Sequence, residues 1–245
     1  LSDKLDTLVG FFGIDLIPTG SKDPYALRRF TIALVRLIIE NKIKIKLRSI
    51  INYSLTLYKE QGFEFDITKV LKDLNNFILD RLKNYSKEKD IRLDIVESSI
   101  LSNDIDDLYN GYKKAEILNR NIKKELGQTV VGIYKRSFSI LSSEIKKNKL
   151  ELSNAVDIGL FKNDFEKNLY KKIQEIKKYF LNVGKNDDFE QSLKELFKFK
   201  EEVNLFFDNV IVNDENELIK KNRLELLNLL CKSFDNFFNF SKIEG

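Results

Sequence analysis

The sequence predicts an all-α fold. Its 245 residues include only 2 Pro and 10 Gly, so few positions interrupt a helix. Apolar residues also recur with the helical period of 3.6 in several long segments. One such stripe lies within residues 67–85 and consists of Val70, Leu71, Leu74, Phe77, Ile78 and Leu82. Residues 42–46 alternate with the period of a strand, but helices are expected on both sides, so we interpret them as a connector or a helix start.

The N-terminal third predicts helices with recognisable ends. Ser2 is the expected N-cap of a short helix that buries Leu5, Leu8, Val9 and Phe12 and ends at Gly13. After a turn at residues 18–21, Asp23 is expected to cap a new helix with Pro24 at its first position. Residues 30–40, 47–60 and 67–85 continue the helical pattern, the last with Asp66 or Thr68 as cap, and polar residues 86–90 mark a boundary.

The remaining chain predicts six more helical segments. They span residues 91–99, 104–124, 128–147, 163–181 with Asn163 as cap, 189–208, and a last helix after the expected cap pair Asn213-Asp214. In this last helix Ile219, Leu226, Leu230, Phe234 and Phe237 form the apolar stripe, and Lys221, Glu225, Asn228, Lys232 and Asp235 form the opposite one. Residues 150–159 are expected to be a link and residues 182–188 a loop.

Composition excludes several kinds of chemistry. The chain has no His, so it cannot contain a His general base, a Ser-His triad or a His-ligated metal, and its single Cys excludes a Cys-rich zinc site. There is no P-loop, no GxGxxG motif and no metal-ligand spacing. We therefore expect no catalytic residue, no bound cofactor and no metal in this chain.

The overall balance of residue types suits a globular chain in a reducing compartment. Charged residues make up 33% and apolar residues 42%, and the net charge of +4 does not by itself indicate a nucleic-acid partner. Cys231 has no partner for an intrachain disulfide, and no apolar run approaches the ~18 residues of a membrane span. We expect a cytoplasmic protein. Because Met is absent and the chain begins within a motif, we interpret it as a fragment of a longer polypeptide.

Charge is distributed unevenly along the chain. Residues 113–149 contain ten Lys or Arg and three Asp or Glu, whereas residues 186–217 contain three Lys and ten Asp or Glu. The basic segment can contact several phosphates and would then bind RNA in a salt-dependent way. The same excess also fits a solvated helix surface in a Lys-rich chain, so charge alone leaves both interpretations open.

Two segments carry a family resemblance. Residues 3–14 read DKLDTLVGFFGI and residues 22–29 read KDPYALRR, and this pair resembles the signature of the glycyl-tRNA synthetase beta-subunit family. That family usually has Gly in place of Asp15 and Ala33, and Phe in place of Tyr25. Near the other end, Phe206-Phe207-Asp208, Val210-Ile211-Val212, Asp214-Glu215 and Asn222-Arg223-Leu224 resemble the end of its DALR-type anticodon-binding domain.

The resemblance implies an architecture and a function. Residues 1–90 would end a larger helical body, and residues 91–245 would contact tRNA, with a DALR-like anticodon-binding helical bundle over about 125–245. The chain would hold the anticodon side of glycine tRNA within glycine–tRNA ligase. In this family two alpha and two beta subunits assemble, and the alpha subunit holds glycine and ATP. The implied partners are therefore glycine tRNA and the alpha subunit, without a membrane or DNA.

The resemblance also suggests residues for tRNA binding. Lys113-Lys114 and Lys135-Arg136 are similar to basic stretches of the family, the latter with Tyr134 in place of Asn. Glycine anticodons share two cytosines, so Asn222 and Arg223 are candidates for hydrogen bonds to bases, and Lys135-Arg136 for phosphate. Phe206, Phe207 and Tyr134 could stack on unpaired bases, although core packing explains each one as well. We expect Arg28 and Arg29 to tie the helical body together through carboxylates.

Two alternatives remain open. The chain could be a non-catalytic helical module that docks to the alpha subunit or to another protein. It could also be the DALR domain of arginyl-tRNA synthetase, which shares that architecture, although the DKLDTLVGFFGI segment argues against this because a class I catalytic domain should precede that domain.

Overall fold

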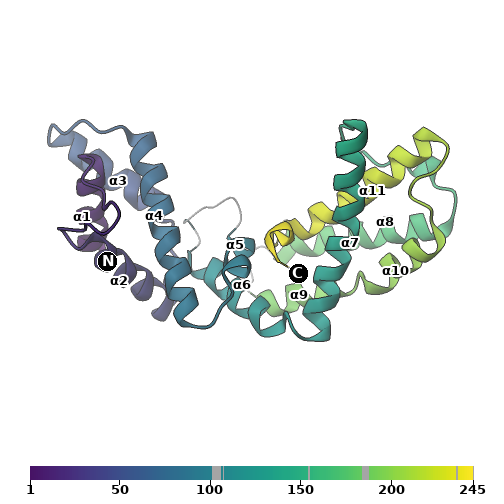
Figure 1. The fold of residues 1–245 in the computed structure, drawn as a ribbon, viewed down its shortest axis with the longest axis horizontal. Coiled ribbons are helices and arrows are strands. Elements are labelled where there is room, and N and C mark those ends of the chain that lie inside the picture. Colours follow the sequence, from purple (N-terminus) through teal and green to yellow (C-terminus); the bar gives the residue numbers. More distant parts are fainter. Residues whose placement is uncertain (101–105, 107, 154, 184–187, 236, 245) are drawn as a thin grey trace. The chain divides into compact units, whose positions relative to one another are not determined.

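Every regular element in the described part of the chain is a helix. The computed structural model describes residues 1–245 except 101–105, 107, 154, 184–187, 236 and 245, and within the described part it has no strand, only an isolated bridge between Thr19 and Lys22. The all-α prediction is confirmed (Figure 1). None of the helices in that part is both long and apolar enough to cross a membrane.

The helices have the following bounds: α1 Ser2–Gly13, α2 Leu27–Glu40, α3 Leu47–Glu60, α4 Ile67–Glu88, α5 Leu93–Ser99, α6 Leu108–Asn121, α7 Glu125–Asn148, the 3₁₀ turn η3 Ile158–Leu160, α8 Asp164–Val183, α9 Phe189–Phe197, α10 Lys200–Asn209, α11 Glu217–Asp235 and the 3₁₀ turn η4 Phe240–Lys242. They group into two compact units, Leu1–Glu116 and Ile117–Gly245. The predicted division into a domain of residues 1–90 and one of residues 91–245 stays a prediction. The expected helix at residues 104–124 and the loop at 182–188 fall partly outside the described residues.

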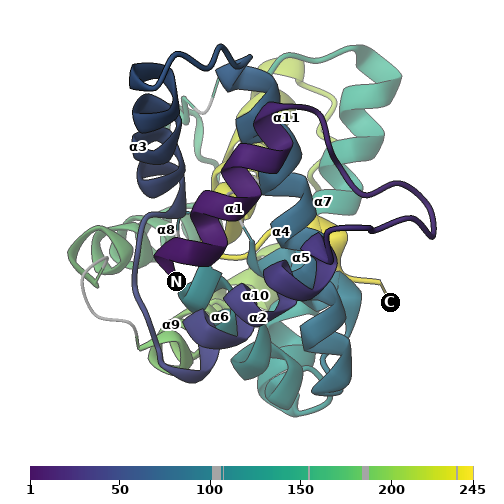
Figure 2. The same cartoon turned by 90° about the vertical axis from the view of Figure 1, so that its left-hand side faces the viewer.

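In the first unit, α1, α2 and α3 pack around α4 (Figure 2). The predicted stripe of α1, Leu5, Leu8, Val9 and Phe12, is fully buried, and the Phe12 ring contacts Phe77 of α4 at 5.2 Å between centroids. Residues 43–46 connect α2 to α3 and belong to neither a helix nor a strand, as the flanking helices had indicated. The Asp66 carboxylate accepts a hydrogen bond from Lys69 N, which confirms it as the N-cap of α4.

Three predicted details of this unit are wrong. Ser2 lies inside α1, whose N-cap is Leu1, and makes no capping hydrogen bond. Helix α2 begins at Leu27, because residues 23–26 form a turn closed by the hydrogen bond from Ala26 N to Asp23 O. The Asp23 carboxylate still caps the helix by accepting from Leu27 N and Arg28 N. Arg28 ties the loop to α2 through the backbone carbonyl of Gly20 rather than through a carboxylate.

The loop after α1 explains one departure from the family pattern. Asp15 has φ 58°, a left-handed conformation that Gly adopts without steric cost and Asp tolerates better than most residues. Its carboxylate also forms an ion pair with Lys69 at 2.5 Å. Asp15 therefore keeps the loop path that a Gly would allow.

In the second unit, α7 and α11 pack against each other, α7 also packs against α9 and α10, and α11 packs against α8. Aromatic rings fill the core between them. Phe234 of α11 contacts Phe199, Tyr134 and Phe240, with centroid separations of 5.4, 6.0 and 5.7 Å. The turn η4 brings Phe240 back against α7, so the end of the chain completes the core.

The predicted single helix over residues 189–208 is broken into α9 and α10. The break lies at Lys198 and Phe199, whose N–H groups donate to the carbonyls of Glu195 and Leu196 in the tighter 3₁₀ pattern. This change of direction places Phe199 fully inside the core, stacked on Phe234. Periodicity does not reveal the break, because both halves carry a helical apolar stripe.

The start and the polar face of α11 also differ from the prediction. Asn216, not the pair Asn213-Asp214, caps α11 through hydrogen bonds from Leu218 N and Ile219 N to its side-chain oxygen. Glu225, assigned to the opposite stripe, is only 2% exposed. The predicted apolar residues of the helix are nevertheless buried, including Phe237 beyond its end.

Candidate nucleic-acid interface

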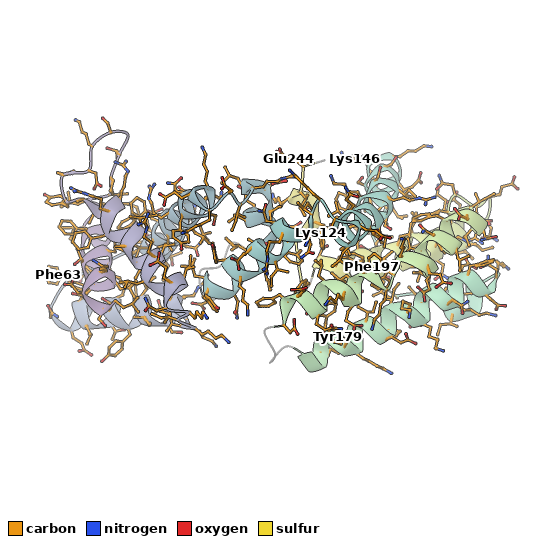
Figure 3. All side chains as sticks on the ribbon, turned by 90° about the horizontal axis from the view of Figure 1, so that it is seen from below. Phe63, Lys124, Lys146, Tyr179, Phe197 and Glu244 are labelled. Carbon is orange, nitrogen blue, oxygen red and sulfur yellow. The ribbon has the colours of Figure 1, made fainter. Side chains whose placement is uncertain are left out.

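Helix α7 carries the predicted basic pair Lys135-Arg136 and ends with Lys146 and Lys147. Arg136, Lys146 and Lys147 are exposed, and Lys135 is half-buried. Lys124, the N-cap residue, and Lys146 mark the two ends of the helix (Figure 3). Within the described part of the chain these α7 cations form no ion pair shorter than 4 Å.

Both carboxylates of α7 are instead paired with lysines of other helices. Glu125 receives a hydrogen bond from Lys200 of α10 at 2.6 Å, and Glu144 receives one from Lys220 of α11 at 2.8 Å. These hydrogen bonds to the lysines lower the pKa of Glu125 and Glu144. Both carboxylates of α7 are therefore paired with lysines of other helices, and Lys147 also helps to lower the pKa of Glu144. Lys135, Arg136 and Lys146 remain for an anionic partner.

Arg136 also contacts an aromatic ring. Its guanidinium carbon lies 4.2 Å from the centroid of the Phe207 ring, which α10 contributes. Phe207 is half-buried and packs edge-on against Phe206, with 5.4 Å between centroids. A cation on the face of a ring is attracted by its quadrupole, so this contact limits the orientations of an exposed Arg side chain.

The other two candidates for base contacts, Asn222 and Arg223, point into the fold. Asn222 is 4% exposed, donates to Asp157 O at 2.9 Å and accepts from Asp157 N at 2.8 Å. One turn further, the Glu225 carboxylate accepts from the N–H and the hydroxyl of Ser153. These α11 side chains thus fix the segment before α8 to the core.

Arg223 is the centre of a buried polar network. Its guanidinium donates to Glu166 at 2.6 Å, to Asp214 at 2.7 Å and to Ile211 O at 2.8 Å. Glu166 in turn accepts from Asn163 N while Asn163 accepts from Glu166 N, a capping box that confirms Asn163 as the cap of α8. Arg223 therefore joins the start of α8 to the loop before α11, and its role in tRNA contact stays a prediction.

The remaining basic candidates, Lys113 and Lys114, lie on α6 in the first unit. Both are half-buried, and each has an interaction partner within the chain. Lys135 and Arg136 belong to the second unit, so the four lysine and arginine candidates do not come from one compact unit.

Two of the three aromatic candidates are core residues. Phe206 is not exposed at all and Tyr134 is 2% exposed, and burial raises the pKa of the Tyr134 hydroxyl. Phe207 alone keeps part of its ring at the surface. Among the described residues no cluster of His, Cys, Asp and Glu is arranged to hold a metal ion.

Sequence reasoning missed that the surface around Arg136 is open. Gly132, one turn earlier on α7, is exposed, and a Cβ built on it meets no atom within 4 Å. Ser139 and Ser143, further along the same face, are exposed as well. The signal was present in the helical spacing of these small residues around Arg136, since positions three and four apart share a face.

Comparison with known proteins gives two family matches. Residues 1–101 match the model described as glycyl-tRNA synthetase beta subunit, and residues 130–244 match the DALR anticodon binding domain. The chain is similar to the glycine–tRNA ligase beta subunits of Clostridioides difficile (strain 630) and Rickettsia typhi (strain ATCC VR-144 / Wilmington), 32% identical over 243 residues, which is 99% of this chain and 34% of each relative. The subunit of Ruegeria sp. (strain TM1040) is 31% identical over 245 residues. The chain thus spans about a third of the length of these relatives.

Proposed function

The chain belongs to the glycyl-tRNA synthetase beta-subunit family, as a C-terminal portion with a DALR anticodon-binding domain, and from this we propose that it holds the anticodon side of glycine tRNA. Aminoacylation would take place at the alpha subunit, which would use ATP and assemble with the beta subunit as two copies of each. The proposed compartment is the cytoplasm, where the thiol of the buried Cys231 would stay reduced. The match of residues 1–101 leaves no reason to retain arginyl-tRNA synthetase.

The exposed cations of α7 carry the proposal. They lie almost entirely inside the DALR match, and the carboxylates on the same helix are neutralised by Lys200 and Lys220. Each cation that neutralises a phosphate releases counterions, so log K falls with log salt by about 0.7–0.9 per contact. We expect the four cations Lys135, Arg136, Lys146 and Lys147 to contribute a slope of about 3 in this way.

The test is equilibrium binding of a fluorescent glycine tRNA transcript to the full 245-residue chain between about 50 and 200 mM NaCl. We expect Lys135→Ala/Arg136→Ala to reduce the slope by about 1.5 and the affinity by about tenfold at 150 mM NaCl. The matched control is Lys177→Ala/Lys178→Ala, which removes two exposed cations from α8.

The outcomes distinguish a specific RNA interface on α7 from an effect of the net charge of the chain. Equal losses from both double variants would mean that only net charge matters, and binding of the wild-type chain that does not depend on salt would refute the proposal. The chain by itself should form no glycyl-adenylate, because it contains no catalytic residue that we can assign. Circular dichroism melts of each variant confirm that the compared proteins are folded.

Docking to the alpha subunit is the second candidate function. The observation that favours it is a pair of exposed apolar side chains in the first unit, Phe63 and Ile67, which are 45% and 46% exposed. They line a cavity of about 310 Å³ together with Leu55, Phe65 and the charged Lys59 and Glu64. A pull-down of the alpha subunit after nuclease treatment would support this function, and loss of capture in Phe63→Ser would place it on this surface. Retained capture by Phe63→Ser would remove this surface from the interface.

A further inference from the structure

The contact with the Phe207 ring orients the guanidinium group of Arg136. The guanidinium carbon lies over the ring, 4.2 Å from its centroid, well within the range of a cation–π contact. Arg136 makes no hydrogen bond and no ion pair within the described part of the chain. Its N–H groups and one face of its plane are therefore available to a ligand.

The helix around Arg136 leaves room for a flat ligand. Gly132 lies one turn before it with open space where a side chain would begin, and the exposed Ser139 lies one turn after it. On α10, the half-buried Phe207 supports the guanidinium from the inner side. A planar group can approach the outer side without displacing a large side chain.

We propose that Arg136, held over the Phe207 ring, is a binding subsite for one unpaired nucleobase of the bound tRNA. An unpaired base stacks its face on a guanidinium, whose N–H edge then donates to base or phosphate oxygens. Bases inside a duplex have both faces covered, so this subsite selects a loop nucleotide over a stem. The inference rests on the proposed function and assigns to Arg136 a contact with a base in addition to the contact with phosphate.

The decisive variant keeps the charge and removes the plane. Arg136→Lys retains the cation for a phosphate but cannot stack, so we expect it to weaken binding of a fluorescent glycine tRNA anticodon stem-loop by about five- to a hundredfold with an unchanged salt slope. Lys177→Arg on α8 is the matched control, at an exposed cation outside the proposed interface, and should bind like the wild type. Phe207→Leu should weaken binding to a lesser extent, and its melting temperature shows whether α10 still packs.

Abasic substitutions in the loop locate the base. One abasic position should reproduce the loss caused by Arg136→Lys, and combining the two should cause no further loss, because both remove the same contact. Gly132→Leu should block the approach, whereas Gly132→Ala should not. Wild-type affinity in Arg136→Lys, or equal further losses at every abasic position, would overturn the subsite while leaving the proposed function intact. An absence of salt-dependent binding by the wild-type chain would overturn both.

Discussion

Replacing Arg223 with Ala tests whether this residue serves the fold or the tRNA. The Arg223 and Glu166 side chains are 7% and 1% exposed and are joined at 2.6 Å. Truncation would leave the Glu166 carboxylate buried without its cation, and breaking such a pair costs about 3–5 kcal/mol. The second unit has about 130 residues, so the unfolding entropy of about 2.1 cal/mol/K per residue converts this to a fall in Tm of about 10–20 °C.

The assay is thermal and urea unfolding of Arg223→Ala, Glu166→Gln and Arg223→Ala/Glu166→Gln. The double variant removes both charges, and we expect it to be more stable than the sum of the single losses by about 2 kcal/mol. Arg136→Ala is the surface control and should change the free energy of unfolding by less than about 0.5 kcal/mol. A loss below about 1 kcal/mol in Arg223→Ala would refute the reasoning. Reduced tRNA affinity in the folded variant would then assign Arg223 to the interface.

Three further outcomes follow from particular positions. Gly127→Ala should destabilise the chain by about 1–3 kcal/mol, because its Cβ would lie 2.2 Å from the Asn121 carbonyl oxygen. Gly132→Ala has open space around its Cβ and should stabilise the chain by up to about 1 kcal/mol. Urea unfolding of the two variants measures both changes and their opposite signs. Ala26→Gly should raise Tm slightly. Ala26 has φ 56°, a left-handed conformation that costs a residue with a Cβ about 1 kcal/mol and that Gly adopts freely. The greater conformational freedom of Gly in the unfolded chain offsets part of this gain. Burial raises the pKa of the Asp235 carboxyl above its ordinary 3.8, so the folded chain binds more protons than the unfolded one between the two values, and stability falls as pH rises through that window. Asp235→Asn should therefore be more stable than the wild type at pH 7 but not below about pH 3, as measured by urea unfolding at both.

Helices were predictable from the sequence wherever an apolar stripe and a local cap coincide. The segments 47–60 and 67–85 correspond closely to α3 and α4, and Asp66 caps α4 as expected. Two errors have different causes. The break at Phe199 exists because its ring is buried on Phe234, a contact between distant residues that a stripe of apolar residues cannot indicate. Residues 23–26 instead form a local turn, and the Asp-Pro pair that begins it is also typical of a helix start.

The candidate site was less predictable than the fold. Composition located the basic segment, and the resemblance selected Lys135 and Arg136 within it, but a sequence does not say which polar residues form bonds inside the fold. Asn222 and Arg223 are adjacent to solvent-facing Lys221 in the sequence, yet both are buried with partners more than fifty residues away along the chain. The Arg136 contact with Phe207 likewise joins two helices that only the folded chain brings together.

The free energy of a contact with RNA differs between Arg223, in the buried network of α11, and Arg136, on the surface of α7. An arginine that already donates to Glu166, Asp214 and a backbone carbonyl would have to break those bonds to reach a base, at a cost comparable to the 3–5 kcal/mol of a broken buried pair. Arg136 has no such bond to break and is oriented in advance by Phe207, so less side-chain entropy is lost when a base binds. For equal contacts with RNA, the free energy therefore favours Arg136 over Arg223 as the residue that contacts the tRNA.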